Sequence, residues 1–163
     1  VIGGGLHIAM HAFGKITLFF CAGAILVASH KTLVSELDGI GRRMPLTMGA
    51  FVIGALSIIG LPPMGGAWSK WHLMLGAADA GQYVFIAVWM LSSLLSAAYL
   101  IPVISRAFFQ SPASVGAAAT GADGIREAPA FCLIAMAITS AGTFILFFFA
   151  GDIAQLLAPI AAE

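Results

Sequence analysis

The stretch that decides the fold is Gly60-Leu61-Pro62-Pro63-Met64-Gly65-Gly66-Ala67-Trp68-Ser69-Lys70-Trp71, which interrupts a long run of apolar residues. The proline and glycine pairs oppose a continuous helix, so a helix that reaches this stretch is expected to break. Lys70 follows the break, and a lysine near the middle of a bilayer costs about 2.5–3.5 kcal/mol on insertion scales. Irregular backbone at that depth is tolerated only where protein or a water-filled cavity covers it. A broken helix beside a charge is typical of transport sites, so the sequence predicts an ion-translocating membrane protein.

The overall composition supports the membrane class. Of 163 residues, 61% are hydrophobic and 9% are charged, whereas soluble domains average about a quarter charged residues. Seven basic and seven acidic residues balance each other, so we expect no nucleic-acid partner. Cys21 and Cys132 have neither metal-ligand nor disulfide spacing and are predicted to be small buried hydrophobic residues. Neither a metal nor a cofactor is expected.

Four apolar segments are long enough to cross about 30 Å of hydrocarbon. They cover approximately residues 6–29, 46–78, 84–109 and 130–151. The sequence therefore predicts an all-α, multi-pass integral membrane protein with four transmembrane helices and the lipid bilayer as its surroundings.

The second segment is predicted to be discontinuous. Residues 46–78 would form a helix about 50 Å long at 1.5 Å per residue, which exceeds the thickness of the bilayer core. The excess disappears if residues 61–66 form a non-helical crossing between two half-helices. Four residues are expected to make this break: Pro62, Pro63, Gly65 and Gly66.

The loop charges predict the orientation of the chain. The connection over residues 30–45 contains Lys31, Arg42 and Arg43, whereas residues 79–83 contain no lysine or arginine. Residues 110–129 contain Arg126 and are rich in small residues. The positive-inside bias then makes the first and third connections cytoplasmic, the third as a linker. The chain starts without Met, which we interpret as the C-terminal part of a longer protein.

Three ionisable residues of the first segment are spaced to form one stripe. His7, His11 and Lys15 follow at i, i+4 and i+8, which spreads them over about 12 Å of helix. An imidazole accepts a proton on one nitrogen and releases one from the other, and a partly desolvated lysine also exchanges protons near neutrality. The pattern predicts a proton relay. The alternative is a set of hydrogen bonds between helices.

Lys70 has an alternative role as well. A lysine can extend its aliphatic stem to the membrane surface, with Trp68 and Trp71 as interfacial anchors. About 15 apolar residues precede the break and more follow it, which favours a deep position and a role in proton transfer. His72 lies two residues further on and would point away from Lys70 on a helix.

Two sequence motifs resemble a known family. Residues 7–23, His-Ile-Ala-Met-His-Ala-Phe-Gly-Lys-Ile-Thr-Leu-Phe-Phe-Cys-Ala-Gly, resemble the H-x-x-x-H-A-x-x-K-x-x-L-F-x-x-A-G helix of antiporter-like membrane subunits. Gly39-Ile40-Gly41-Arg42-Arg43-Met44-Pro45, Gly60-Leu61-Pro62-Pro63 and Trp68-Ser69-Lys70 are similar to the next helix, whereas Gly14 and Gly66-Ala67 depart from the bulkier residues of the family. With Arg-Arg-Met-Pro at residues 42–45 and Ser-Lys-Trp at residues 69–71, the sequence looks most like the D-type member of the multisubunit Mrp-type cation/proton antiporters. The same family supplies membrane subunits of respiratory complex I and of membrane-bound hydrogenases.

The resemblance implies a fold of about fourteen helices with two inverted repeats. Residues 1–109 would then hold helices of the second, proton-translocating repeat, residues 110–129 the linker, and residues 130–163 the last helix and tail. His7, His11 and Lys15 would lie on a central hydrophilic axis, with Lys70 on the broken helix near an exit.

The function implied is a proton-conducting subunit of a monovalent cation (Na⁺)/proton antiporter in the plasma membrane of a prokaryote. The partners would be the other subunits of a membrane complex, and the chain itself would be a transporter subunit without enzymatic chemistry. The alternative is a proton-pumping subunit of complex I (NADH:quinone oxidoreductase) or of a hydrogenase.

Overall fold

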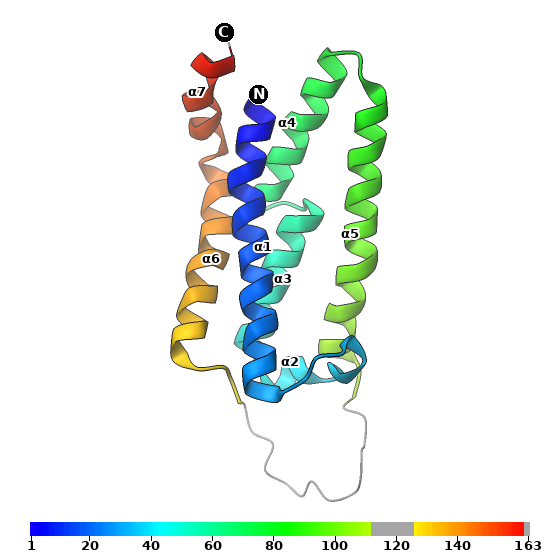
Figure 1. Cartoon of the computed structure of the whole chain (residues 1–163), viewed down its shortest axis with the longest axis vertical. Helices are drawn as coiled ribbons and strands as arrows, with labels where there is room; N and C mark the ends of the chain where they lie inside the picture. The colour runs from blue at the N-terminus through cyan, green and yellow to red at the C-terminus, as the bar shows by residue number, and fades with distance from the viewer. Residues whose placement is uncertain (112–125, 162–163) are drawn as a thin grey trace, which may run out of the picture.

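The computed structural model describes residues 1–111 and 126–161, which form an elongated bundle of helices (Figure 1). The elements are α1 (Ile2–Ser29), the 3₁₀ turn η1 (Val34–Glu36), α2 (Ile40–Arg43), α3 (Pro45–Ile59), α4 (Gly65–Asp79), α5 (Tyr83–Phe109), α6 (Ala130–Phe148) and α7 (Ala150–Ala161). The all-helical prediction is confirmed for these residues. Most of the predicted 110–129 linker lies outside the described residues.

Three of the described helices are long and apolar enough to cross a membrane. They are α1, α5 and α6, with 28, 27 and 19 residues. The other predicted span corresponds to α3 and α4, which have 15 residues each and would each cover only about 23 Å. In Figure 1, α3 occupies the lower half of the bundle and α4 the upper half. That this pair crosses the bilayer as one broken span stays a prediction.

The predicted break is present, but it is shorter than expected. The chain leaves the helix after Ile59 and re-enters it at Gly65, so Pro62 and Pro63 lie in the break. The prediction that Gly65 and Gly66 also lie in it was wrong, because both belong to the first turn of α4. A glycine is required at position 66 for a steric reason, because a Cβ there would collide with the carbonyl oxygen of Ser57. Gly66 therefore serves close helix packing and leaves the helix intact.

Gly60 ends α3 in the left-handed conformation, with φ = 92°. Glycine adopts this conformation without the Cβ penalty of other residues. The amides of Gly60 and Leu61 both donate to the carbonyl of Leu56, each at 2.9 Å. The carbonyls of the last two residues of α3 are left available for other donors.

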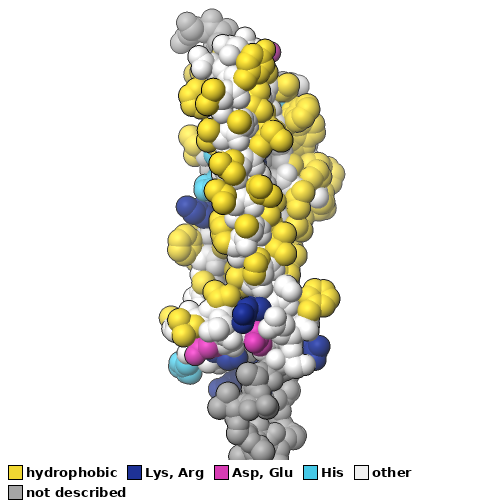
Figure 2. Space-filling model, turned by 90° about the vertical axis from the view of Figure 1, so that its right-hand side faces the viewer, with side chains coloured by type: hydrophobic (Ala, Val, Ile, Leu, Met, Phe, Trp, Pro, Cys, Tyr) yellow, Lys and Arg dark blue, Asp and Glu magenta, His cyan; other side chains and the backbone are white. Residues whose placement is uncertain are grey.

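Apolar side chains cover the middle of the bundle, and charged ones gather at its lower end (Figure 2). The exposed apolar residues include Val84 (74%) and Leu94 (67%) on α5. Water would make such a surface costly, whereas lipid tails would not. The surface therefore fits a bilayer around the central part of the bundle.

The start of α6 is tied to the start of α3 across a long sequence separation. The Glu127 carboxylate accepts from the backbone amide of Leu46 at 2.6 Å and from the Thr47 hydroxyl at 2.7 Å. A carboxylate at the positive end of a helix is favourable, and here it also satisfies amides that lack helical partners. The contact fixes the lower end of the bundle below the site.

Candidate functional site

The four ionisable residues predicted from the sequence line one cavity. The cavity has a volume of about 250 Å³ and lies among α1, α3, α4 and α5. Its walls include His7, His11, Lys15, Leu18, Ile58, Lys70, Trp89, Ser92, Ser96 and Tyr99. We call it the inner cavity. The structure thus brings Lys70 to the same space as the α1 stripe, although the two are separated by more than fifty residues in sequence.

Lys70 is 8% exposed and fully hydrogen-bonded. Its Nζ donates to the carbonyl oxygens of Ile58 (2.9 Å) and Ile59 (3.0 Å) and to Ser93 Oγ (2.8 Å). An ammonium group has three donors, so each has an acceptor. The two carbonyls belong to the last residues of α3, where the negative end of the helix dipole favours a cation. The helix break thus creates the binding site for this lysine.

Within the part of the chain that the structure describes, Lys70 has no carboxylate partner. Its stem also packs closely on the break, since a Cβ on Gly60 would lie 2.8 Å from Lys70 Cδ. The charge is therefore held by backbone dipoles and one hydroxyl. Loss of a proton would leave a neutral amine, whose hydrogen bonds to these carbonyls are weaker than those of the charged ammonium.

His7 is connected to the first turn of α4 through Ser69. Ser69 Oγ donates to the carbonyl oxygen of Gly66 at 3.1 Å. His7 Nδ1 lies 3.1 Å from Ser69 Oγ. The tautomer with its hydrogen on Nδ1 fits this arrangement, because the Ser69 hydroxyl already donates to Gly66. In the neutral ring, Nε2 is then the atom free to accept a proton.

His11 and Lys15 continue the row from His7. The rings of His7 and His11 are stacked with centroids 5.0 Å apart. Neither the His11 ring nor the Lys15 ammonium has a side-chain hydrogen bond among the described residues, and Lys15 is exposed. In Figure 2, histidine and basic side chains lie together at mid-height on one edge of an otherwise apolar band. The row therefore leads from the buried Lys70 region toward the flank of the bundle.

Helix α5 supplies polar side chains to the site that were not predicted from the sequence. Ser92, Ser96 and Tyr99 line the inner cavity, and Ser93 binds Lys70. The signal was available, because positions 92, 96 and 99 repeat at steps of four and three and so share one face of a helix. His72 is absent from this cavity and its Nδ1 lies 2.9 Å from the carbonyl of Trp68, in agreement with the expectation that it points away.

Fold and site together define a multi-pass α-helical membrane protein with ionisable residues around a central cavity beside a broken helix. Residues 1–96 match the family described as NADH:quinone oxidoreductase/Mrp antiporter, TM. The chain belongs to this family. The described residues hold no cluster of three or more histidine, cysteine or acidic side chains suited to a metal ion.

Curated relatives carry the names of respiratory membrane subunits. The chain is 44% identical over 147 residues to NADH-quinone oxidoreductase subunit N of Desulforudis audaxviator, a match that covers 86% of this chain and 29% of that protein. It is 34% identical to NADH-quinone oxidoreductase subunit L of Rickettsia bellii, covering 64% of this chain and 16% of the relative. It is 34% identical to NADH-ubiquinone oxidoreductase chain 5 of Sus scrofa, covering 66% and 18%. The chain thus spans less than a third of the length of each of these relatives.

Proposed function

We propose that this chain forms part of a proton-translocating subunit of a multisubunit membrane complex, with protons moving along His7, His11, Lys15 and Lys70. The observation that carries the proposal is the inner cavity, where four ionisable side chains from two helices meet. Ionisable residues are expensive inside a membrane and mark ion or proton pathways when they line a cavity. Family membership supports the same interpretation.

The proposed path uses hopping between ionisable groups through water. The His7 ring, with Nδ1 on Ser69 Oγ, accepts a proton at Nε2 and gives the same proton up to water in the inner cavity. The neighbouring His11 ring takes a proton from that water and passes it on toward Lys15. Lys70 holds a proton on Nζ while its ammonium group is hydrogen-bonded to the carbonyls at the end of α3. A positive charge on one lysine disfavours a second charge nearby, so proton transfer at one site changes the occupancy of the next.

Two driving reactions are candidates. The relatives are named as subunits of NADH-quinone or NADH-ubiquinone oxidoreductases, which favours a pump driven by electron transfer in partner subunits. The Arg42-Arg43-Met44-Pro45 and Ser69-Lys70-Trp71 motifs resemble the D-type member of the Mrp-type antiporters, which favours exchange of protons for sodium. In both cases the plasma membrane of a prokaryote is the proposed location.

One experiment tests proton translocation and separates the two drivers. Inverted vesicles would carry the complete subunit with its partners, in a host that lacks its own antiporters and NADH:quinone oxidoreductase. We expect NADH to build an acidic interior if electron transfer drives the complex. We expect sodium to collapse a preformed pH gradient if the complex is an antiporter. An assembled complex that responds to neither addition would contradict the proposed function.

His11→Ala should reduce transport several-fold and change its dependence on pH. The stacked ring is the link between His7 and Lys15, and its removal leaves a gap that water must bridge at a lower rate. The measurement is the rate of proton movement in vesicles between pH 6 and 9, with His30→Ala as the control, since His30 lies beyond the end of α1. Unchanged rates across this range would instead support a purely structural role for the His11 ring.

A further inference from the structure

A second cavity lies at the end of the bundle where α4 turns into α5. Its volume is about 630 Å³, and its walls come from the start of α1, the second half of α4 and the start of α5. The polar side chains that line it are His72, Asp79 and Gln82. We call it the end cavity. These groups can hold water, which requires several polar partners to be stable in a protein.

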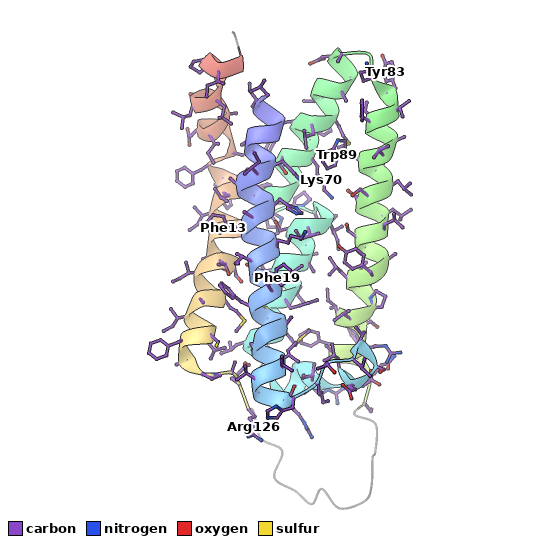
Figure 3. The ribbon with its side chains drawn as sticks, in the orientation of Figure 1. Phe13, Phe19, Lys70, Tyr83, Trp89 and Arg126 are labelled. Atoms are coloured by element: carbon purple, nitrogen blue, oxygen red, sulfur yellow. The ribbon has the colours of Figure 1, made fainter. Side chains whose placement is uncertain are left out.

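Trp89 is the one residue common to the walls of the inner cavity and the end cavity. Its indole packs edge-on against the His7 ring, with centroids 5.2 Å apart and planes at 69°. Figure 3 shows Trp89 between α4 and α5, on the Tyr83 side of Lys70. The side chain therefore lies between the proton-carrying residues and the open end of the bundle.

We propose that Trp89 is the barrier between the inner cavity and the end cavity, and that its displacement joins them into one water-filled path for protons. The inference rests on the proposed use of the inner cavity for protons. His7 is the proton-carrying group at the inner side of the barrier, and His72 and Asp79 are the ionisable groups at its outer side. An indole between them is large enough to exclude a continuous chain of water, and its ring packs against the ring of His7.

Accessibility of a cysteine inside the inner cavity tests the barrier without measuring transport. Ser96 lines that cavity and is 8% exposed, and its hydroxyl bonds only within its own helix, to the carbonyl of Ser92. Ser96→Cys would be introduced into the complete subunit in its assembled complex. The probe is a membrane-impermeant, cationic methanethiosulfonate, applied from the side of the α4–α5 turn. Labelling is compared with the same complex lacking the added cysteine.

We expect Trp89→Ala to accelerate labelling of the cysteine at least ten-fold and to raise the passive proton leak of vesicles. Trp89→Phe should stay within about two-fold of the parent, because a phenyl ring still fills much of the space. The matched control is Trp68→Ala, since Trp68 contacts Phe147 and His72 and does not line the inner cavity. Trp89→Leu, which removes the aromatic ring but keeps some apolar packing, replaces the alanine variant if the latter does not assemble, and we expect it to accelerate labelling by more than Trp89→Phe does.

Equal labelling rates in the Trp89→Ala complex and its parent would overturn the barrier. An equal acceleration in Trp68→Ala would do so too, because it would show a general loosening of the bundle. The labelling rate does not depend on ion transport. If the labelling rate depends on Trp89 but the complex transports no protons, the proposed function would be contradicted. The proposal that Trp89 separates the two cavities would still be supported.

Discussion

We expect Lys70→Ala to abolish or greatly reduce proton transport by the assembled complex. The substitution removes the proposed proton carrier at the helix break. It also leaves the carbonyls of Ile58 and Ile59 and the Ser93 hydroxyl without their donor. Each buried polar group left unsatisfied costs about 1–3 kcal/mol, so some loss of stability accompanies the loss of transport. The measurement is the initial rate of proton movement in vesicles, normalised to the amount of assembled complex.

Lys31→Ala is the matched control for this variant. Lys31 lies outside the helices, and its ammonium contacts only the exposed turn at Glu36. We expect this control to transport protons at the rate of the parent. Wild-type transport by the assembled Lys70→Ala complex would exclude Lys70 from the proton path.

Gly66→Ala should prevent normal assembly of the subunit. The added Cβ would overlap the carbonyl oxygen of Ser57, and a backbone atom of α3 has no free rotation by which to move away. The start of α4 must then separate from α3, which also moves Lys70 relative to its carbonyl acceptors. Overpacking of this kind costs about 1–3 kcal/mol or more. We expect a several-fold lower yield of assembled complex and a lower melting temperature.

Gly76→Ala provides the matched control in the same helix. A Cβ at Gly76 meets nothing within 4 Å, and alanine is about 0.5–1 kcal/mol more favourable than glycine inside a helix. This variant should assemble as well as the parent. If Gly66→Ala assembles equally well, the close approach of α3 and α4 is not needed for the fold.

The helical architecture could be predicted because it depends on local features. Segments of apolar residues longer than a bilayer core identify α1, α5 and α6, and the Pro62–Pro63 pair identifies the break. The error at Gly65 and Gly66 has a physical cause, because glycine can mark either a break or a close helix contact. The contact partners, Ser57 for Gly66 and Met10 and Thr143 for Gly65, are known only from the fold.

Part of the site could also be predicted. The stripe of His7, His11 and Lys15 follows from helical spacing within one segment. The surroundings of Lys70 do not, because its acceptors are two backbone carbonyls and a serine from another helix. Such carbonyls carry no sequence signal of their own, and they become available only where a helix ends.

Proton movement by a Lys70→Arg complex shows whether Lys70 carries protons or only a charge. An arginine keeps the positive charge and several donors for the α3 carbonyls, but it does not release its proton in proteins. In vesicles that carry the assembled complex, we expect the Lys70→Arg variant to lose proton transport although its melting temperature stays near that of the parent. Transport at the wild-type rate would show that Lys70 supplies a fixed charge and carries no proton.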